Sequence, residues 1–175
     1  ANFAYVPMPG GAAAVKHPLR MAYGVLWAYD LLEHPAAAAA LAPLGDEAEV
    51  CDTMIERGLN TPMTSSVGRL FDAASALLGI CTEPSYEGEG AILLEAAMET
   101  AGADVAGAAA VEEAAGVAGE DELAAKERYA VIVEKNTATE TSTAQDTSVL
   151  LLDAEPTFHA LLDDLAAGVP ASVIS

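Results

Sequence analysis

The chain has 175 residues, of which 53% are hydrophobic and 19% charged, a composition that excludes disorder throughout and suits a packed domain. Seven Lys and Arg residues stand against 27 Asp and Glu residues, which gives a formal net charge of -20. A surface this negative repels phosphate backbones and anionic headgroups, so we expect neither nucleic acid nor a membrane as a partner.

The first third of the chain predicts an extended start followed by helices. Residues 3–8 indicate an extended segment closed by the turn at 9–11. Helical spacing and a proline at the first helical position predict a helix over 18–33, which His34-Pro35 ends. A short helical turn is expected over 36–42. Asp46 is a candidate cap for a helix over 47–57.

The segment from Thr64 to Gly79 has the clearest pattern in the sequence. Apolar residues recur at helical spacing and predict one stripe facing the core: Val67, Leu70, Phe71, Ala74, Leu77 and Leu78. Four other residues lie on a different face of the predicted helix: Gly68 and the polar residues Arg69, Asp72 and Ser75. Ser65 or Ser66 is the candidate N-cap, and Gly79 is the expected stop.

The rest of the chain predicts a helix over 89–101, a hairpin and a final helix. The hairpin pairs 129–133 with 149–152, and the final helix spans 156–167. We therefore expect an α+β fold that is predominantly helical, with a small β-hairpin. Residues 1–175 are interpreted as a single partial domain, in which 102–148 form a variable excursion.

Cysteine and histidine usage predicts no metal site in this stretch. Cys51 and Cys81 form no CxxC motif and are interpreted as reduced thiols of a cytoplasmic protein. His17, His34 and His159 are scattered and match no zinc spacing. The sequence contains neither a signal peptide nor an apolar run of membrane-spanning length, and both ends are interpreted as cuts in a longer protein.

Two segments could carry ligand chemistry. The start of the helix at 64–73 offers free backbone N–H groups, Gly68 permits close approach of a ligand, and Asp72 can accept hydrogen bonds from hydroxyls. The simpler interpretation is a surface pair between Arg69 and Asp72, which are neighbours on one helix face. The glycine-containing turn at 86–90 matches neither a P-loop nor a dinucleotide fingerprint.

The order of these motifs resembles the HypF carbamoyltransferases, which mature [NiFe] hydrogenases. The resemblance rests on Val-Pro-Met-Pro-Gly-Gly at 6–11, Lys-His-Pro-Leu-Arg-Met-Ala at 16–22, Thr-Ser-Ser-Val-Gly-Arg-Leu-Phe-Asp-Ala at 64–73, Tyr-Glu-Gly at 86–88, Leu-Glu at 94–95 and the tail at 161–170. The chain departs from the family at Ala12, where Asp is usual, and at Glu89-Gly90, where Gln-Ala is usual.

The resemblance implies an enzyme that makes carbamoyl-adenylate from carbamoyl phosphate and ATP. It then transfers the carbamoyl group to the C-terminal cysteine of HypE, where it becomes a cyanide ligand of the hydrogenase. The implied architecture is one lobe of an actin-like, sugar-kinase-like (ASKHA) domain. The implied nucleotide-binding residues are Ser66, Gly68, Arg69, Asp72, Glu87 and Gly88. Among these, Gly68 and Asp72 would contact the ribose, and the turn at 86–89 would lie near the adenine.

The same resemblance implies that essential parts of the enzyme lie outside this stretch. The metal ion, zinc or iron, would be held by an upstream His motif, and the phosphate loop would lie downstream. The catalytic residues are therefore unknown, and we expect the chain alone to be inactive. Two alternatives stay open: an antibiotic-tailoring O-carbamoyltransferase, and a non-catalytic acidic helical interaction module.

Overall fold

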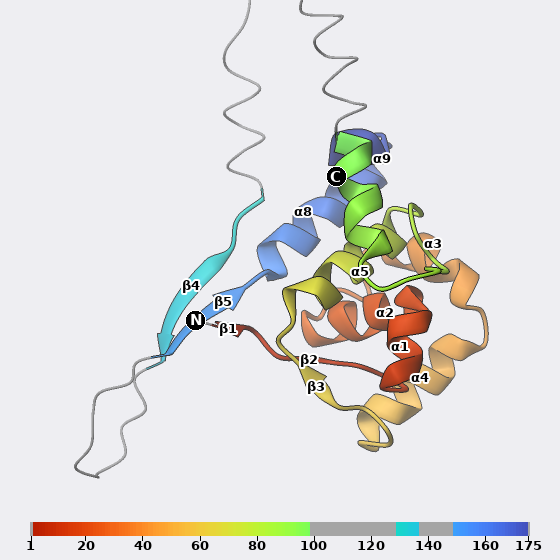
Figure 1. Cartoon of the computed structure of the whole chain (residues 1–175), viewed down its shortest axis with the longest axis vertical. Helices are drawn as coiled ribbons and strands as arrows, with labels where there is room; N and C mark the ends of the chain where they lie inside the picture. The colour runs from red at the N-terminus through yellow and green to blue at the C-terminus, as the bar shows by residue number, and fades with distance from the viewer. Residues whose placement is uncertain (1, 99–128, 137–148, 175) are drawn as a thin grey trace, which may run out of the picture.

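A computed structural model of the chain describes residues 2–98, 129–136 and 149–174. It has an α+β fold in which a helical body carries a small sheet at one side (Figure 1). The labelled helices are α1 (Ala12–Lys16), α2 (Pro18–Ala28), α3 (Ala37–Leu41), α4 (Glu47–Glu56), α5 (Val67–Leu77), α8 (Glu155–Ala166) and α9 (Ala171–Ile174). A 3₁₀ turn spans Ala42–Leu44, and residues 89–98 are also helical.

Five short strands form two sheets. The strands are β1 (Asn2–Phe3), β2 (Val6–Pro7), β3 (Met63–Thr64), β4 (Ile132–Asn136) and β5 (Val149–Asp153). β4 and β5 pair antiparallel with Val133 opposite Leu152, which confirms the predicted hairpin, although its first strand spans Ile132–Asn136 and not 129–133. β1 adds to β5 in parallel, and β2 pairs with β3 in a separate sheet. Neither of these pairings was predicted, because each joins segments far apart in the sequence.

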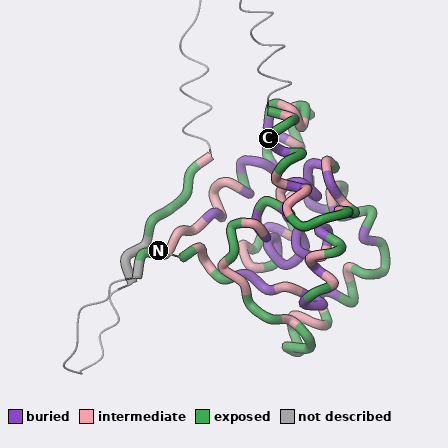
Figure 2. Tube along the Cα trace, in the orientation of Figure 1, coloured by how far each residue is buried: buried purple, intermediate pink, exposed green. Residues whose placement is uncertain are grey.

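Helix α2 is the buried centre of the helical body (Figure 2). From Pro18 to Leu26 every residue except Arg20 is buried, and α2 packs against α5. Gly24 allows α2 to lie directly on the β2 backbone. A Cβ added at Gly24 would meet the carbonyl oxygen of Pro7 at 2.1 Å. The first strand and the central helix are therefore fixed to one another at a point where only glycine fits.

The expected end of this helix at residue 33 was wrong. The helix stops at Ala28 because Asp30 adopts the left-handed conformation, with φ 56°. The Leu31 N–H then donates to the Leu26 carbonyl at 2.8 Å, which closes the helix end. Aspartate tolerates this backbone region better than most non-glycine residues, so Asp30 was a possible sign of the helix end. The apolar spacing of the segment nevertheless favoured a longer helix.

Other boundaries agree within a few residues. The expected helices over 47–57 and 156–167 correspond to α4 and α8, although Asp46 makes no side-chain capping hydrogen bond. Helices α1 and α9 were not predicted.

Most of the expected excursion over 102–148 lies outside the described residues. Among the residues that the structure describes, no helix is both long and apolar enough to cross a bilayer.

We predict that Gly24→Ala destabilises the chain by about 1–3 kcal/mol or more, because the new methyl group overlaps the Pro7 carbonyl. Gly68→Ala is the matched control, since it also places alanine in a helix but meets only the Ser66 hydroxyl, at 3.6 Å. This control should be neutral or stabilising by up to about 1 kcal/mol. Thermal and urea unfolding measure both, and equal stabilities would contradict the close approach.

Candidate functional site

Helix α5 presents a different face to the core than its apolar spacing predicts. Val67 and Phe71 are 45% and 46% exposed, whereas Arg69, Asp72 and Ser75 are buried. The expectation that Arg69 and Asp72 lie on a free polar face is therefore wrong. Leu70 and Leu77 are buried as expected, so the apolar stripe is only partly used.

The buried polar residues of α5 pair with one another and with Glu87. Arg69 Nη1 lies 3.0 Å from Asp72 Oδ2, and Arg69 Nη2 donates to Glu87 Oε1 at 3.3 Å. The Nη1 contact is an ion pair without hydrogen-bond alignment. Ser75 Oγ donates to the backbone carbonyl of Asp72 at 2.9 Å. These contacts offset the cost of removing charged and hydroxyl groups from water, so this side of α5 can be covered.

The turn at 86–90 covers the polar side of α5. A Cβ added at Gly90 would lie 2.6 Å from Ser75 Oγ and 3.5 Å from Asp72 Oδ1. The start of the 89–98 helix therefore approaches α5 closely at a residue without a side chain. Polar spacing at Arg69, Asp72 and Ser75, together with glycines in the following turn, was the sequence signal for this packing.

The carboxyl group of Asp72 has a raised pKa. Burial is the main cause, the Arg69 guanidinium acts in the opposite direction, and the Glu87 carboxylate adds to the rise. The ionised Asp72 thus depends on Arg69 for stabilisation. With a side chain 84% exposed, Glu87 forms the solvent-facing end of this Asp72–Arg69–Glu87 chain of charges.

The remaining predicted residues lie beside this charge chain, and the Ser66 carbonyl accepts a hydrogen bond from the Arg69 N–H at 3.0 Å. Ser66 is the N-cap residue of α5 and is exposed, and its side chain makes no capping hydrogen bond. Gly68 is half-buried at the first turn of the helix. Gly88 has φ 86°, and a Cβ added there would meet nothing within 4 Å. The accessible part of the candidate site is therefore formed by Ser66, Gly68, Glu87 and Gly88.

Glu89 replaces the glutamine that is usual in the resembled family, and it has a structural task here. Its Oε2 accepts hydrogen bonds from the Ser85 N–H at 2.5 Å and from Ser85 Oγ at 2.9 Å. These bonds lower the pKa of the Glu89 carboxyl group. Glu89 thus holds the turn that positions Glu87 and Gly88.

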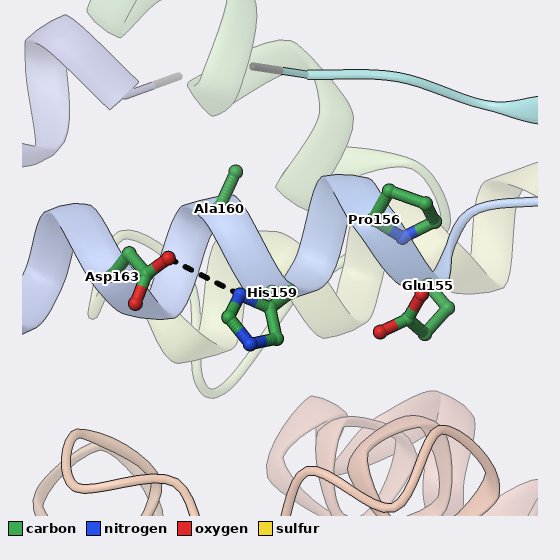
Figure 3. Close-up of a pocket in the computed structure, with 5 residues that line it drawn as sticks. All are labelled: Glu155, Pro156, His159, Ala160 and Asp163. Carbon is green, nitrogen blue, oxygen red and sulfur yellow. Dashed lines mark hydrogen bonds and ion pairs between the residues drawn. The ribbon is translucent and has the colours of Figure 1, made fainter.

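A second polar group was missed in the sequence. His34, which follows α2, lies beside His159 and Asp163 of α8, although the histidines were expected to be scattered. Figure 3 shows His159 and Asp163 on one side of α8, joined by an interaction of 3.1 Å. Their separation by four residues on a helix was the available signal. Nothing in the sequence pattern places His34 there, because it is 129 residues away from Asp163.

We predict that Asp72→Ala destabilises the chain by about 3 kcal/mol, because it leaves the buried Arg69 without its closest counter-charge. Glu87→Ala removes the other partner of the same arginine from an exposed position and should cost under about 1 kcal/mol. Urea unfolding of the two variants measures the difference. A negligible effect of Asp72→Ala would show that the pair is exposed in solution.

Comparisons with known proteins agree on one family. The profile described as "Carbamoyltransferase, Kae1-like Domain, second subdomain" of HypF matches residues 1–175. Carbamoyltransferase HypF2 of Cupriavidus necator is 39% identical over 97 residues, which cover 55% of this chain and 12% of that protein. A probable carbamoyltransferase HypF of Methanocaldococcus jannaschii is 39% identical over 92 residues, covering 49% of this chain and 11% of that protein.

Solved structures show the same fold. A full-length HypF crystallised in a phosphate- and nucleotide-bound form has a TM-score of 0.64 at 24% identity, over 99% of this chain and 21% of that one. The HypF of T. kodakarensis has a TM-score of 0.59 at the same identity, over 99% of this chain and 19% of that one. The chain thus spans a small part of the relatives it matches. From its first residue to its last, it belongs to the HypF carbamoyltransferase family, in the second subdomain of the Kae1-like domain.

Proposed function

We propose that this chain forms one wall of the nucleotide site in a carbamoyltransferase of the HypF type. The whole enzyme would make carbamoyl-adenylate from carbamoyl phosphate and ATP and pass the carbamoyl group to the C-terminal cysteine of HypE. The product would become the cyanide ligand of a [NiFe] hydrogenase. The wall would belong to one lobe of an ASKHA-type domain in a cytoplasmic enzyme, whose zinc or iron is held by residues outside this stretch.

The observation that carries this proposal is the contact between Arg69 and Glu87. Arg69 Nη2 lies 3.3 Å from Glu87 Oε1, so the contact joins the two segments that carry the family's sequence motifs, the start of α5 and the turn at 86–88. Gly68 and Gly88 flank the contact and leave room for a ligand to approach the backbone. The nucleotide-bound form of a full-length HypF with the same fold supports a nucleotide as the ligand.

The charges of the wall favour a particular part of the nucleotide. Arg69, Asp72 and Glu87 together carry one net negative charge, so the wall would repel phosphate and attract hydroxyl and amino donors. We assign it to the ribose and adenine. Since Asp72 is buried against Arg69, its role is to position the arginine, and Glu87 takes the role of hydroxyl acceptor that the sequence suggested for Asp72.

The two alternative functions are less well supported. The curated relatives described above are named as HypF carbamoyltransferases, which favours HypE over a small-molecule acceptor. A non-catalytic interaction module would explain the acidic surface but gives no reason for a buried Arg69–Asp72 pair that is joined to an exposed Glu87 in a glycine-containing turn.

We predict that, in the intact protein containing this chain, Glu87→Ala weakens adenosine binding by about 1.5–3 kcal/mol, the usual range for a hydrogen bond to a charged group. Glu95→Ala is the control, because it removes a carboxylate that is also exposed and lies in the 89–98 helix that follows the turn. Calorimetric titration measures both variants beside thermal melting. Equal affinities for adenosine would reject the ribose and adenine assignment.

We also predict that the 175-residue chain alone carbamoylates no HypE, even when carbamoyl-adenylate is supplied. Transfer from a mixed anhydride needs charge stabilisation at the phosphate, and this wall carries a net negative charge. Mass spectrometry of the HypE C-terminal peptide is the measurement. A carbamoylated peptide above the protein-free control would contradict the prediction.

A further inference from the structure

The group at His34, His159 and Asp163 has the composition of a metal site. One possible ligand atom from each residue lies within 4.8 Å of the other two. Two imidazole nitrogens and a carboxylate oxygen form a donor set that suits zinc and neighbouring divalent transition metals. The three residues come from two separate elements, the segment after α2 and helix α8, which the nucleotide wall does not use.

Two nitrogen–oxygen distances within the group are close to those between neighbouring ligands of one metal ion. His34 Nε2 lies 3.2 Å from Asp163 Oδ1, and His159 Nδ1 lies 3.1 Å from Asp163 Oδ2. In a tetrahedral site with bonds of about 2.0–2.1 Å, neighbouring ligand atoms are roughly 3.4 Å apart. The ring centres of His34 and His159 are 5.5 Å apart and the ring planes form an angle of 81°, so the rings are arranged edge to face and are not stacked.

His34 is the least exposed member of the group. Its side chain is only 10% exposed, and its Nδ1 accepts a hydrogen bond from the Ala36 N–H at 3.2 Å. That bond places the proton of the neutral ring on Nε2. Binding a metal at Nε2 would move this proton to Nδ1, which would then face the Ala36 N–H. Metal binding therefore requires that the 3.2 Å hydrogen bond from Ala36 is given up for a metal–nitrogen bond.

The other two ligands provide an open side for the metal to enter. The side chains of His159 and Asp163 are 50% and 48% exposed. They line a shallow hollow with Glu155, and Figure 3 shows all three on the same side of α8. A fourth ligand can therefore be water from this hollow. The chain's net charge of -20 favours a cation here over an anion.

We propose that His34, His159 and Asp163 bind one divalent transition metal ion, zinc in the first instance, which ties the segment after α2 to helix α8. The bound ion replaces the hydrogen bonds that the three side chains make with one another. The site is structural, and it departs from the sequence-based expectation that this stretch binds no metal. It also stands independently of the proposed nucleotide wall.

Titration of the metal-free 175-residue chain with zinc at neutral pH tests the site, and we expect one zinc ion per chain. His159→Ala should weaken binding by about tenfold or more, and Asp163→Asn should do the same. His17→Ala is the matched control, because His17 is exposed and lies outside the group. Its affinity should equal that of the unmodified chain.

Thermal melting separates binding from folding. Zinc should raise the melting temperature of the unmodified chain and of His17→Ala, and leave that of His159→Ala unchanged. His159 is half-exposed, so the metal-free melting temperatures should be similar. Cobalt(II) can replace zinc as a probe. An absorption spectrum typical of a cobalt(II) ion with a low coordination number, present in the unmodified chain and absent in His159→Ala, would support the ligand set. Absence of zinc binding, or equal zinc affinity in His159→Ala and the unmodified chain, would overturn the proposal.

Discussion

Helix α2 packs against so much of the chain that the positions of most other elements depend on it. It is buried over almost its whole circumference, with α5, α4 and the β2 strand around it. At Gly24 the helix touches the Pro7 backbone, so even a methyl group would separate the two. The N-terminal Val-Pro-Met-Pro-Gly-Gly segment is thereby held against the core, and the turn at 9–11 follows from that position.

The second constraint is the buried charge of α5. Arg69 and Asp72 can be buried only because they pair with each other and because Gly90 lets the next helix approach. Burial of one such pair adds little net stability, but removal of either partner leaves an uncompensated charge. The pair therefore fixes the rotation of α5. That rotation leaves Phe71 and Val67 exposed and points Arg69 toward the turn that carries Glu87.

The third connection is between the helical body and helix α8, which carries the sheet strand β5. Tyr29 and Phe158 pack with ring centres 5.9 Å apart and ring planes tilted by 40°, and His34 reaches Asp163 nearby. Apolar and polar contacts thus act on the same two elements. A metal at the histidine group would strengthen a junction that the aromatic contact already forms, so its effect would be on stability and on the placement of β5.

Local structure and family membership could both be inferred from the sequence. Helical spacing, glycine stops and β-branched runs predicted α2, α4, α5, α8 and the β4–β5 hairpin, because these depend on near neighbours in the chain. The order of the sequence motifs, above all the motif at 64–73, predicted the family. The buried side of α5, in contrast, depends on tertiary packing. The apolar stripe and the Arg69–Asp72 pair compete for the core, and the 86–90 turn covers the pair. Likewise, no local pattern could bring His34 to Asp163, since that contact requires α8 to pack beside the end of α2.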